Sequence, residues 1–529
     1  MPNRLIDLSG NNDQVLLVEQ FETSMPYAAL SYCWGENICT TVKTTRGNIE
    51  QFRKGTIRDA IIVCRLLNIR FLWVDALCII QDDVDQIDWY LESAMMCDIY
   101  SNAHLVIAAE ESPSCTSGFL RRLSSSRWKS FQMMFESQDF PITIHMNSVD
   151  YVPPGNCETD PDVITKSALS QRAWTFQETI LPYRILHFTK TDMIWECNAG
   201  ATSESEYSAY ILPKMLANLV VARPATSALP STAGDSDDDR CEYVSTHISD
   251  FYVRTSPAAV YWAWQRMVEH YSRRRLTRHQ DKLTAMSGLA QLVLKMNGVD
   301  HTDYFAGLWR GQFVKDLLWH VSGPWEPRRF ADYVAPSWSW ASVSTGVKYF
   351  AEQYQFDFTE MVVIREVKCS FSPLNPTGSV TSGHIIAAGS LWPVALYETS
   401  SDESMYTGHN GHAGRLLKFI VNYMWPSERP SYRYEVLLDE RLQSGTSSDE
   451  YYCLVVGANL EKKGPRVREW FLILRETRSR RGSYRTFERV GIGYHHYKIG
   501  PDSTSMTDNH EKKDRDTREG VQGKGEELS

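Results

Sequence analysis

Three short apolar runs, separated by two segments of helical periodicity, constrain the fold of this chain more than any other feature. The runs are 27–32 (YAALSY), 70–80 (RFLWVDALCII) and 104–109 (HLVIAA), and each has the length of one buried strand. Between them, 55–69 and 85–100 repeat apolar residues every three or four positions, which predicts amphipathic helices. This alternation of strand and helix predicts an α/β fold with a mainly parallel sheet flanked by helices.

The ends of these elements can also be predicted. Thr56 and Asp59 have the spacing of a capping box, so the first helix should begin there. The second helix should pack on the sheet through Leu91 and Met95, which share one helical face. The second apolar run should end as a strand near Asp75. That residue would then present a carboxylate at the carboxyl edge of the predicted sheet.

The 529 residues are too many for one ordinary core, and composition changes along the chain indicate where it divides. The Pro-, Ser- and Asp-rich stretch 223–240 predicts a flexible linker or loop over 216–245. The next segment, 246–345, is helical in pattern and should pack on the N-terminal domain. Short apolar runs over 346–500 predict a β-rich region, and the lack of apolar anchors in 501–529 predicts a disordered tail.

Charge and residue usage argue against several classes of protein. The net charge of −10 disfavours general nucleic-acid binding, which needs a basic surface. No apolar run is long enough to cross a membrane, and the first residues lack the pattern of a signal peptide. The 11 Cys contain no CxxC pair and the 14 His are dispersed, so we expect free thiols and no metal site. We therefore predict a protein of the reducing cytosol or nucleus, with a cytoplasmic location as the first choice.

Polar and aromatic residues gather where the first two predicted strands end. Asp75 lies where ligands of open parallel sheets bind, so its carboxylate could orient a ribose or a catalytic group. It could equally be a structural carboxylate that accepts backbone N–H bonds. The first strand ends in Ser31 and Tyr32, and Trp34 and Gly35 follow. An aromatic ring at this place could stack on a flat ligand, and the glycine permits a close approach of the backbone. The alternative is that these aromatic side chains plug the sheet.

The stretch RAWTFQE (172–178) has two interpretations. It could start a helix that buries Trp174 and Phe176 and exposes Glu178. It could instead hold Glu178 as a fixed carboxylate at the end of the sheet, with Arg172 and Trp174 shaping the rim of a cleft. The choice between the two interpretations needs the rest of the chain.

Several stretches, taken in order, resemble fungal heterokaryon-incompatibility (HET) domain proteins. Those within the domain are 27–35 (YAALSYCWG), 71–81 (FLWVDALCIIQ), 88–109 (DWYLESAMMCDIYSNAHLVIAA) and 172–188 (RAWTFQETILPYRILHF). Further stretches are similar to segments that often follow the domain: 271–290, 306–321 and 335–343. The resemblance implies a HET domain over 1–215, with its core at 27–200.

HET domains are distantly similar to TIR domains, many of which cleave NAD. The shared order is a strand ending in Ser-Tyr, a strand ending in Asp, and a Trp followed four residues later by Glu. This similarity implies a TIR-like core with insertions and NAD as a substrate, with no cofactor. It implies that Glu178 is catalytic and Asp75 supporting, and that the substrate is bound by Ser31, Tyr32, Trp34, Gly35, Arg172 and Trp174.

The same resemblance implies a role in fungal non-self recognition and programmed cell death, in which incompatible fused cells are killed. Three ways of acting remain open: hydrolysis of NAD, signalling without catalysis, and a duty in a secondary-metabolite pathway. The expected partners are a protein or further copies of this chain, together with NAD. We expect neither nucleic-acid binding nor a membrane span.

Overall fold

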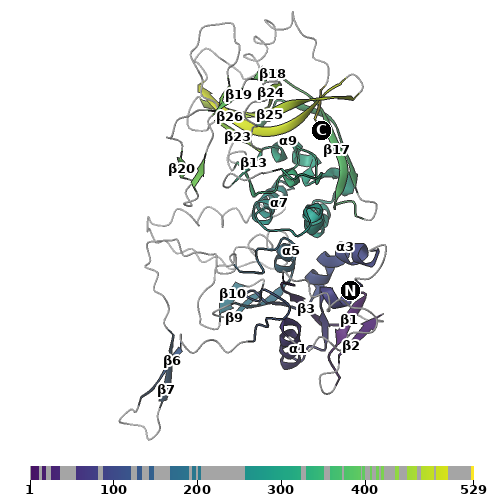
Figure 1. The fold of residues 1–529 in the computed structure, drawn as a ribbon, viewed down its shortest axis with the longest axis vertical. Coiled ribbons are helices and arrows are strands. Elements are labelled where there is room, and N and C mark those ends of the chain that lie inside the picture. The colour runs from purple at the N-terminus through teal and green to yellow at the C-terminus, as the bar shows by residue number, and fades with distance from the viewer. Residues whose placement is uncertain are drawn as a thin grey trace, which may run out of the picture. The chain divides into compact units, whose positions relative to one another are not determined.

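The computed structural model divides the chain into two compact units, Met1–Ser231 and Thr232–Ser529, and each is described by itself (Figure 1). In the first unit, the residues that the structure describes are 2–10, 15–19, 25–35, 55–80, 87–120, 128–133, 142–147, 167–189, 193–197 and 200–203. In the second unit they are 257–322, 329–350, 358–371, 375–394, 396–398, 405–407, 413–415, 419–421, 435–439, 450–460, 466–481, 484–498 and 526–528. The predicted linker, 216–245, lies outside these ranges.

An eight-stranded sheet forms the centre of the first unit, in the order β10-β9-β8-β5-β3-β4-β1-β2. Only its four central strands, β8, β5, β3 and β4, are parallel to one another, so the predicted mainly parallel sheet is a mixed one. Short connections join β1 to β2 and β8 through β9 to β10, and such connections permit only antiparallel pairing. The strands are β1 Arg4–Asp7, β2 Leu16–Glu19, β3 Tyr27–Ser31, β4 Phe71–Trp73, β5 Leu105–Ala108, β8 Arg184–Phe188, β9 Met193–Cys197 and β10 Gly200–Ser203.

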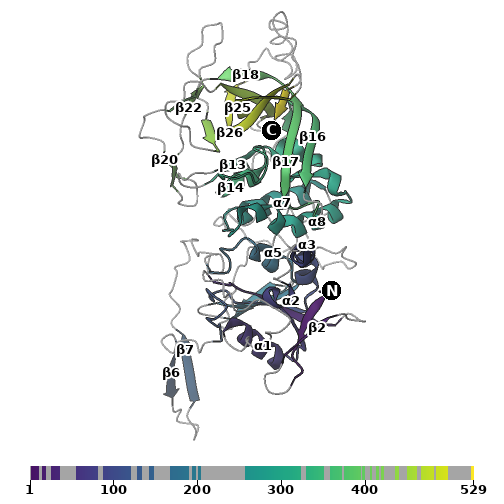
Figure 2. The ribbon, with the colours of Figure 1, turned by 45° about the vertical axis from the view of Figure 1, so that its right-hand side comes forward.

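Helices cover both faces of this sheet. The helices are α1 Thr56–Leu66, α2 Asp75–Cys78, α3 Ile87–Asn102 and α5 Thr175–Ile180. The chain steps from β3 through α1 to β4, then reverses through α3 past β3 to β5, so right-handed crossovers place α1 and α3 on opposite faces. Figure 2 shows α1 on one side of the sheet and α3 and α5 on the other. The connections after the neighbouring strands β3 and β5 therefore diverge to opposite faces, which is where open α/β sheets bind ligands.

The buried face of α3 differs from the predicted one. Leu91 is 51% exposed and Met95 is half-buried, whereas Glu92 and Met96 are buried. The reason is electrostatic, because Arg4 of β1 forms ion pairs with Asp88 and Glu92 and so turns that face of the helix inward. The apolar pattern alone missed this rotation.

The start of α1 also differs from the sequence prediction. Thr56 is the first helical residue and follows Gly55, so no capping box forms. The Thr56 hydroxyl donates instead to the carbonyl of Ser114. The Asp59 carboxylate accepts from the backbone N–H groups of Phe119 and Leu120, so both side chains anchor the loop after β5. Farther along the chain, β6 Trp128–Met133 and β7 Ile142–Asn147 form an antiparallel pair.

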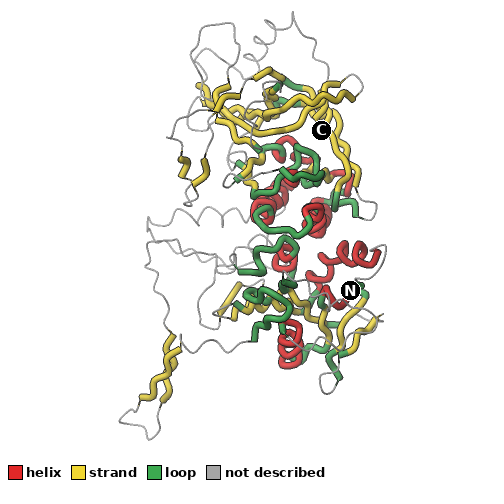
Figure 3. Tube along the Cα trace, viewed as in Figure 1, coloured by secondary structure: helices red, strands yellow, loops and turns green. Residues whose placement is uncertain are grey.

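The second unit combines a helical layer with a nine-stranded sheet, as the red and yellow segments of Figure 3 show. Its main helices are α7 Pro257–Tyr271, α8 Ser287–Asn297 and α9 Phe313–Asp316, with short 3-10 turns at His279–Lys282, Thr284–Met286, His301–Asp303, Arg310–Gln312 and Trp340–Ser342. The strands of the large sheet are β15 Phe358–Glu360, β16 Val363–Phe371, β17 Val380–Ala388, β18 Leu391–Val394, β23 Glu435–Leu438, β24 Tyr451–Leu460, β25 Arg466–Arg481, β26 Tyr484–Lys498 and β27 Glu526–Leu528. Small ladders are formed by β11 Tyr304–Phe305, β12 Leu308–Trp309, β13 Trp319–Val321, β14 Val347–Tyr349, β19 Leu396–Glu398, β20 Met405–Thr407, β21 Ala413–Arg415 and β22 Phe419–Val421.

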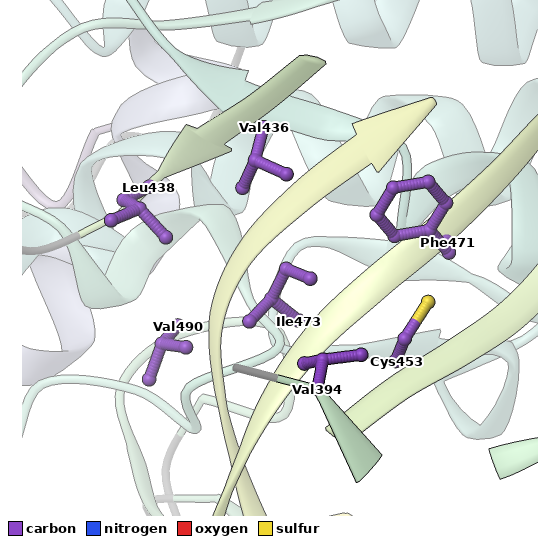
Figure 4. Close-up of a cluster of buried hydrophobic side chains, with 7 residues drawn as sticks. All are labelled: Val394, Val436, Leu438, Cys453, Phe471, Ile473 and Val490. Atoms are coloured by element: carbon purple, nitrogen blue, oxygen red, sulfur yellow. The ribbon is translucent and has the colours of Figure 1, made fainter. Parts of the chain in front are cut away.

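Apolar side chains from several strands of the large sheet form a core in this unit. Figure 4 shows them facing one another: Val394, Val436, Leu438, Cys453, Phe471, Ile473 and Val490. Most of them are β-branched or aromatic, the residue types that pack well on a pleated surface. The β-rich region predicted from short apolar runs is thus present.

Two features of this unit bear on the predicted boundaries. The helical segment 246–345, expected to pack on the N-terminal domain, belongs to the same compact unit as the β-rich region. Arg489 of β26 connects the two layers, because its guanidinium donates to the carbonyls of Leu317 and Trp319. The tail predicted to be disordered, 501–529, ends in a strand, since Glu526–Leu528 pairs with β17 and β26. Residues 501–525 lie outside the described ranges.

Candidate functional site

The candidate site lies at the carboxyl ends of β3 and β4. Ser31 is the last residue of β3, and Asp75 is the first residue of α2, two positions after β4. The strand of the second apolar run thus ends near Asp75, as expected, and a helical turn begins at that residue. The carboxyl end of β3 adjoins the point where the crossovers diverge, so the fold itself brings polar residues together at this edge.

Glu178 reaches this edge from α5. All six residues of the helix are buried, and Glu178 itself is only 5% exposed. The Ser31 hydroxyl donates a hydrogen bond of 2.5 Å to Glu178 Oε2. The interpretation of Glu178 as an exposed helical residue is therefore wrong, and the carboxylate is held at the end of the sheet. Thr175 secures the start of the helix, because its hydroxyl donates to the carbonyls of Leu169 and Arg172.

The electrostatic environment of Glu178 favours its neutral form. The pKa of Glu178 is raised to about 7, chiefly by burial and in addition by the nearby Asp75 carboxylate. Hydrogen bonding from Ser31 and Tyr100, together with the positive charge of Arg172, opposes the rise. A carboxyl group with a pKa near neutrality exchanges its proton readily at cellular pH, which is a property of general acids and bases.

Asp75 is embedded in a hydrogen-bond network of its own. The Trp34 indole N–H donates to Asp75 Oδ2 at 2.9 Å, and the backbone N–H of Ala76 donates to Oδ1 at 2.6 Å. Burial raises the pKa of Asp75, whereas Arg172 and the Tyr32 hydroxyl lower it. The Asp75 carboxylate thus has the structural role considered above, because it accepts a backbone N–H. It also lies beside Glu178.

Arg172 supplies the positive charge at the site. Its Nη1 donates to the carbonyl oxygen of Tyr32 at 2.7 Å, which fixes the chain just after β3. The guanidinium stabilises the ionised forms of both Glu178 and Asp75. The site therefore has one positive charge for two carboxyl groups, and this shortage of positive charge is consistent with the raised pKa of each carboxyl group.

The predicted aromatic contacts occupy different environments. Tyr32 is buried, in keeping with a side chain that plugs the sheet, whereas Trp34 and Trp174 are half-buried. Trp174 precedes α5 and meets Trp89 of α3 edge to face, with ring centroids 6.1 Å apart. Gly35 has φ +98°, and a Cβ there would come within 2.8 Å of Ser114 Cβ, so only glycine fits this close approach.

Two features of the unit were missed by sequence reasoning. Tyr100 of α3 donates its hydroxyl to the carbonyl of Leu30 at 3.1 Å and also influences Glu178. Glu110, His187 and Glu196 form a second buried ionic cluster beside β5, β8 and β9. A polar residue at a buried position of an apolar strand, such as His187 in RILHF, was the available signal. In the part of the chain that the structure describes, no group of three acidic, His or Cys side chains could hold a metal ion.

Comparison with known proteins agrees with the sequence resemblance. Residues 27–178 match the family model described as Heterokaryon incompatibility protein (HET). The part of the first unit from 27 to 178 is thus similar to a HET domain. This HET match begins at β3 and ends at Glu178, so it contains every predicted site residue. No curated protein and no solved structure matches the chain. Among the described residues, no helix is both long and apolar enough to cross a bilayer.

Proposed function

We propose that the HET domain hydrolyses the bond between nicotinamide and ribose in NAD, with Glu178 as the catalytic carboxylate. The observation that carries this proposal is the placement of Glu178. Its carboxyl group lies at the carboxyl end of β3, accepts a hydrogen bond of 2.5 Å from the Ser31 hydroxyl and has a pKa of about 7. The distant similarity of HET domains to TIR domains provides the choice of NAD as substrate.

The chemistry requires a fixed negative charge. The bond between ribose C1′ and the pyridinium nitrogen breaks, and its electron pair leaves with neutral nicotinamide. The ribose becomes an oxocarbenium ion, which an ionised Glu178 stabilises, as carboxylates do in glycoside hydrolysis. Water then attacks C1′ and transfers a proton to Glu178, giving ADP-ribose and nicotinamide. This cycle needs Glu178 ionised at the start, so the rate should rise with pH through about 7.

The surrounding residues have distinct roles in this proposal. Ser31 orients the Glu178 carboxylate through its hydrogen bond, and Arg172 favours the ionised state of Glu178. Asp75 supports the site and holds the Trp34 indole. The half-buried rings of Trp34 and Trp174 offer stacking surfaces for the heteroaromatic parts of NAD. Tyr32 and Gly35 shape the backbone on either side of Trp34, with the left-handed conformation that glycine permits at Gly35.

The biological role that follows is a cytoplasmic effector of fungal non-self recognition. Depletion of NAD would kill the fused cell, and a protein partner or self-association would control when the domain acts. This role rests on the HET match over 27–178, together with the chemistry proposed for Glu178.

The decisive experiment compares the purified full chain with its Glu178→Gln variant. Gln keeps the shape of the side chain and removes its charge, so nicotinamide release should fall by about 100-fold or more. Glu269→Gln is a matched control, because it removes a buried carboxylate from the second unit. Nicotinamide is quantified by chromatography, and toxicity by overexpression in a fungal cell. A well-folded Glu178→Gln protein with undiminished nicotinamide release would exclude the catalytic role.

One observation favours a second candidate function, signalling without catalysis. The whole of α5 is buried, and the Glu178 carboxylate is enclosed by Ser31 and its neighbours. If the wild-type chain releases no nicotinamide but Glu178→Gln abolishes toxicity, the carboxylate serves assembly or partner binding. Light scattering of both proteins would then show a change in self-association.

A further inference from the structure

A second buried ionic cluster lies in the same unit as Glu178. His187 Nδ1 lies 2.7 Å from Glu110 Oε1, and His187 Nε2 lies 2.8 Å from Glu196 Oε2. All three residues are at most 2% exposed. Glu110 follows β5, His187 is in β8 and Glu196 is in β9, so the cluster joins the parallel core to its antiparallel extension.

The geometry of the cluster sets the protonation state of His187. Each ring nitrogen faces a carboxylate oxygen, and a neutral imidazole could donate to only one of them. A doubly protonated ring donates to both, and it offsets part of the negative charge that burial would otherwise make costly. Hydrogen bonding and attraction to Glu110 and Glu196 outweigh burial and raise the pKa of His187 to about 9.

A chain of contacts leads from this cluster to α5. The Ser167 hydroxyl donates to Glu110 Oε2 at 2.5 Å, and the Leu169 N–H donates to the Glu110 carbonyl at 3.2 Å. The carbonyl of Leu169 in turn accepts from the hydroxyl of Thr175, the first residue of α5, at 2.7 Å. Glu178 follows three residues later, so Glu110 holds the segment from which the catalytic helix starts.

Both the cation and the carboxylate of the proposed active site depend on this segment. The backbone N–H of Arg172 donates to the carbonyl of Leu169, and the Arg172 side chain reaches Tyr32. The Ser170 N–H donates to the Ser167 hydroxyl, which closes the turn over Glu110. Residues 167–175 therefore form one hydrogen-bonded turn with an ionic anchor at its beginning.

We propose that Glu110, His187 and Glu196 form a positioning cluster, which fixes the turn 167–175 and thereby holds Glu178 against Ser31. This proposal rests on the proposed role of Glu178. His187 keeps the Glu110 carboxylate in place, and Glu110 transmits that constraint to Ser167 and Leu169. None of the three contacts substrate in this scheme, so they act through α5.

The test uses Ser167→Ala in the full chain, because this change removes the side-chain hydrogen bond to Glu110, keeps the backbone bond from Leu169, and leaves His187 between both carboxylates. Ser112→Ala is the matched control, since Ser112 is equally buried but bonds to Thr56 and to the carbonyl of Ser114. Hydrogen exchange read by mass spectrometry should show amides of 167–181 exchanging roughly 10- to 100-fold faster in Ser167→Ala, the factor expected for a lost bond to a charged group. Amides of β3 and β5 should keep their wild-type rates.

Nicotinamide release gives the second reading. In Ser167→Ala, kcat should fall while KM changes little, and the acid limb of the pH profile should move below about 7 as Glu178 becomes less enclosed. Wild-type exchange over 167–181 in Ser167→Ala would overturn the positioning role. So would equally fast exchange in Ser112→Ala. Hydrogen exchange can be measured whether or not the chain cleaves NAD. A chain that releases no nicotinamide would defeat the proposed function, and the exchange rates of 167–181 would still decide the positioning proposal.

Discussion

The two units each place an arginine beside a buried carboxylate, but the balance of charge differs. In the second unit, Arg489 and Asp439 are fully buried as one pair, with Nε and Oδ2 2.8 Å apart. The remaining guanidinium donors reach the carbonyls of Leu317 and Trp319, and the guanidinium lies 3.6 Å from the Trp319 ring centroid. In the first unit, the single Arg172 stands against Glu178 and Asp75, and the pKa of each carboxyl group is raised.

The Arg489–Asp439 pair supports the structure of its unit, whereas the charge of Glu178 is available for the proposed chemistry. A matched buried pair supports the fold, and its removal should cost stability alone. An unmatched carboxyl group in a buried site costs stability while it is ionised, and folds tolerate that cost chiefly at functional sites. The following predictions test whether the two regions differ in this way.

The largest effect is expected from breaking the matched pair. Arg489→Ala leaves Asp439 buried without its cation, and the free energy of unfolding should fall by about 3–5 kcal/mol. Arg475→Ala is the control, because its pair with Glu488 is partly exposed and should contribute no more than about 1 kcal/mol. Denaturant unfolding of the full chain measures both. Equal losses would show that the buried pair is no more important than a surface pair.

A smaller effect concerns His187, whose pKa is raised from 6.5 to about 9 in the fold. Its stabilising contribution is complete below the unfolded pKa of 6.5 and is lost as pH rises through about 9. The difference corresponds to roughly 3 kcal/mol. The stability advantage of the wild type over His187→Gln should therefore shrink as unfolding is measured from pH 6 to pH 10. An advantage that stays constant over this range would mean that His187 is not held as a cation.

The smallest effect has the opposite sign. Because the pKa of Glu178 is raised from 4.5 to about 7, its ionisation destabilises the fold as pH rises above 4.5, and the cost is complete above about 7. Glu178→Gln removes this cost but places an amide beside Ser31 and Tyr100, so a net gain of about 1–2 kcal/mol is expected at pH 8. At pH 4 the gain should vanish. Thermal unfolding at the two pH values decides; a Glu178→Gln protein that is less stable at pH 8 would contradict the raised pKa.

Sequence patterns predicted the centre of this fold better than its edges. The apolar runs located β3, β4 and β5, and parallel strands bring their carboxyl ends to one edge, so the proximity of Ser31 and Asp75 followed from topology. The strand β1 has only four residues and pairs with β4 across more than 60 positions, so no local pattern revealed it. The rotation of α3 was likewise invisible, because it depends on Arg4 meeting Glu92.

The site was predicted in part for the same reason. The order of the motifs indicated Ser31, Asp75 and Glu178 as site residues. Only the structure shows that Glu178 is buried and hydrogen-bonded to Ser31. The positioning cluster could not have been predicted, since Glu110, His187 and Glu196 are separated along the chain and belong to no shared motif. Long-range pairs of charges are set by packing, and one sequence carries no record of that packing.

The bond between Ser31 and Glu178 joins residues that are 147 positions apart, and this separation has a consequence for synthesis on the ribosome. A nascent chain of 170 residues contains Ser31 and Asp75 but has not yet received Glu178. The strand β8, which completes the parallel core, is made later still. Contacts of such long range form late in folding. A translation product that ends before residue 178 would therefore lack this carboxylate and, under the proposed function, could not cleave NAD.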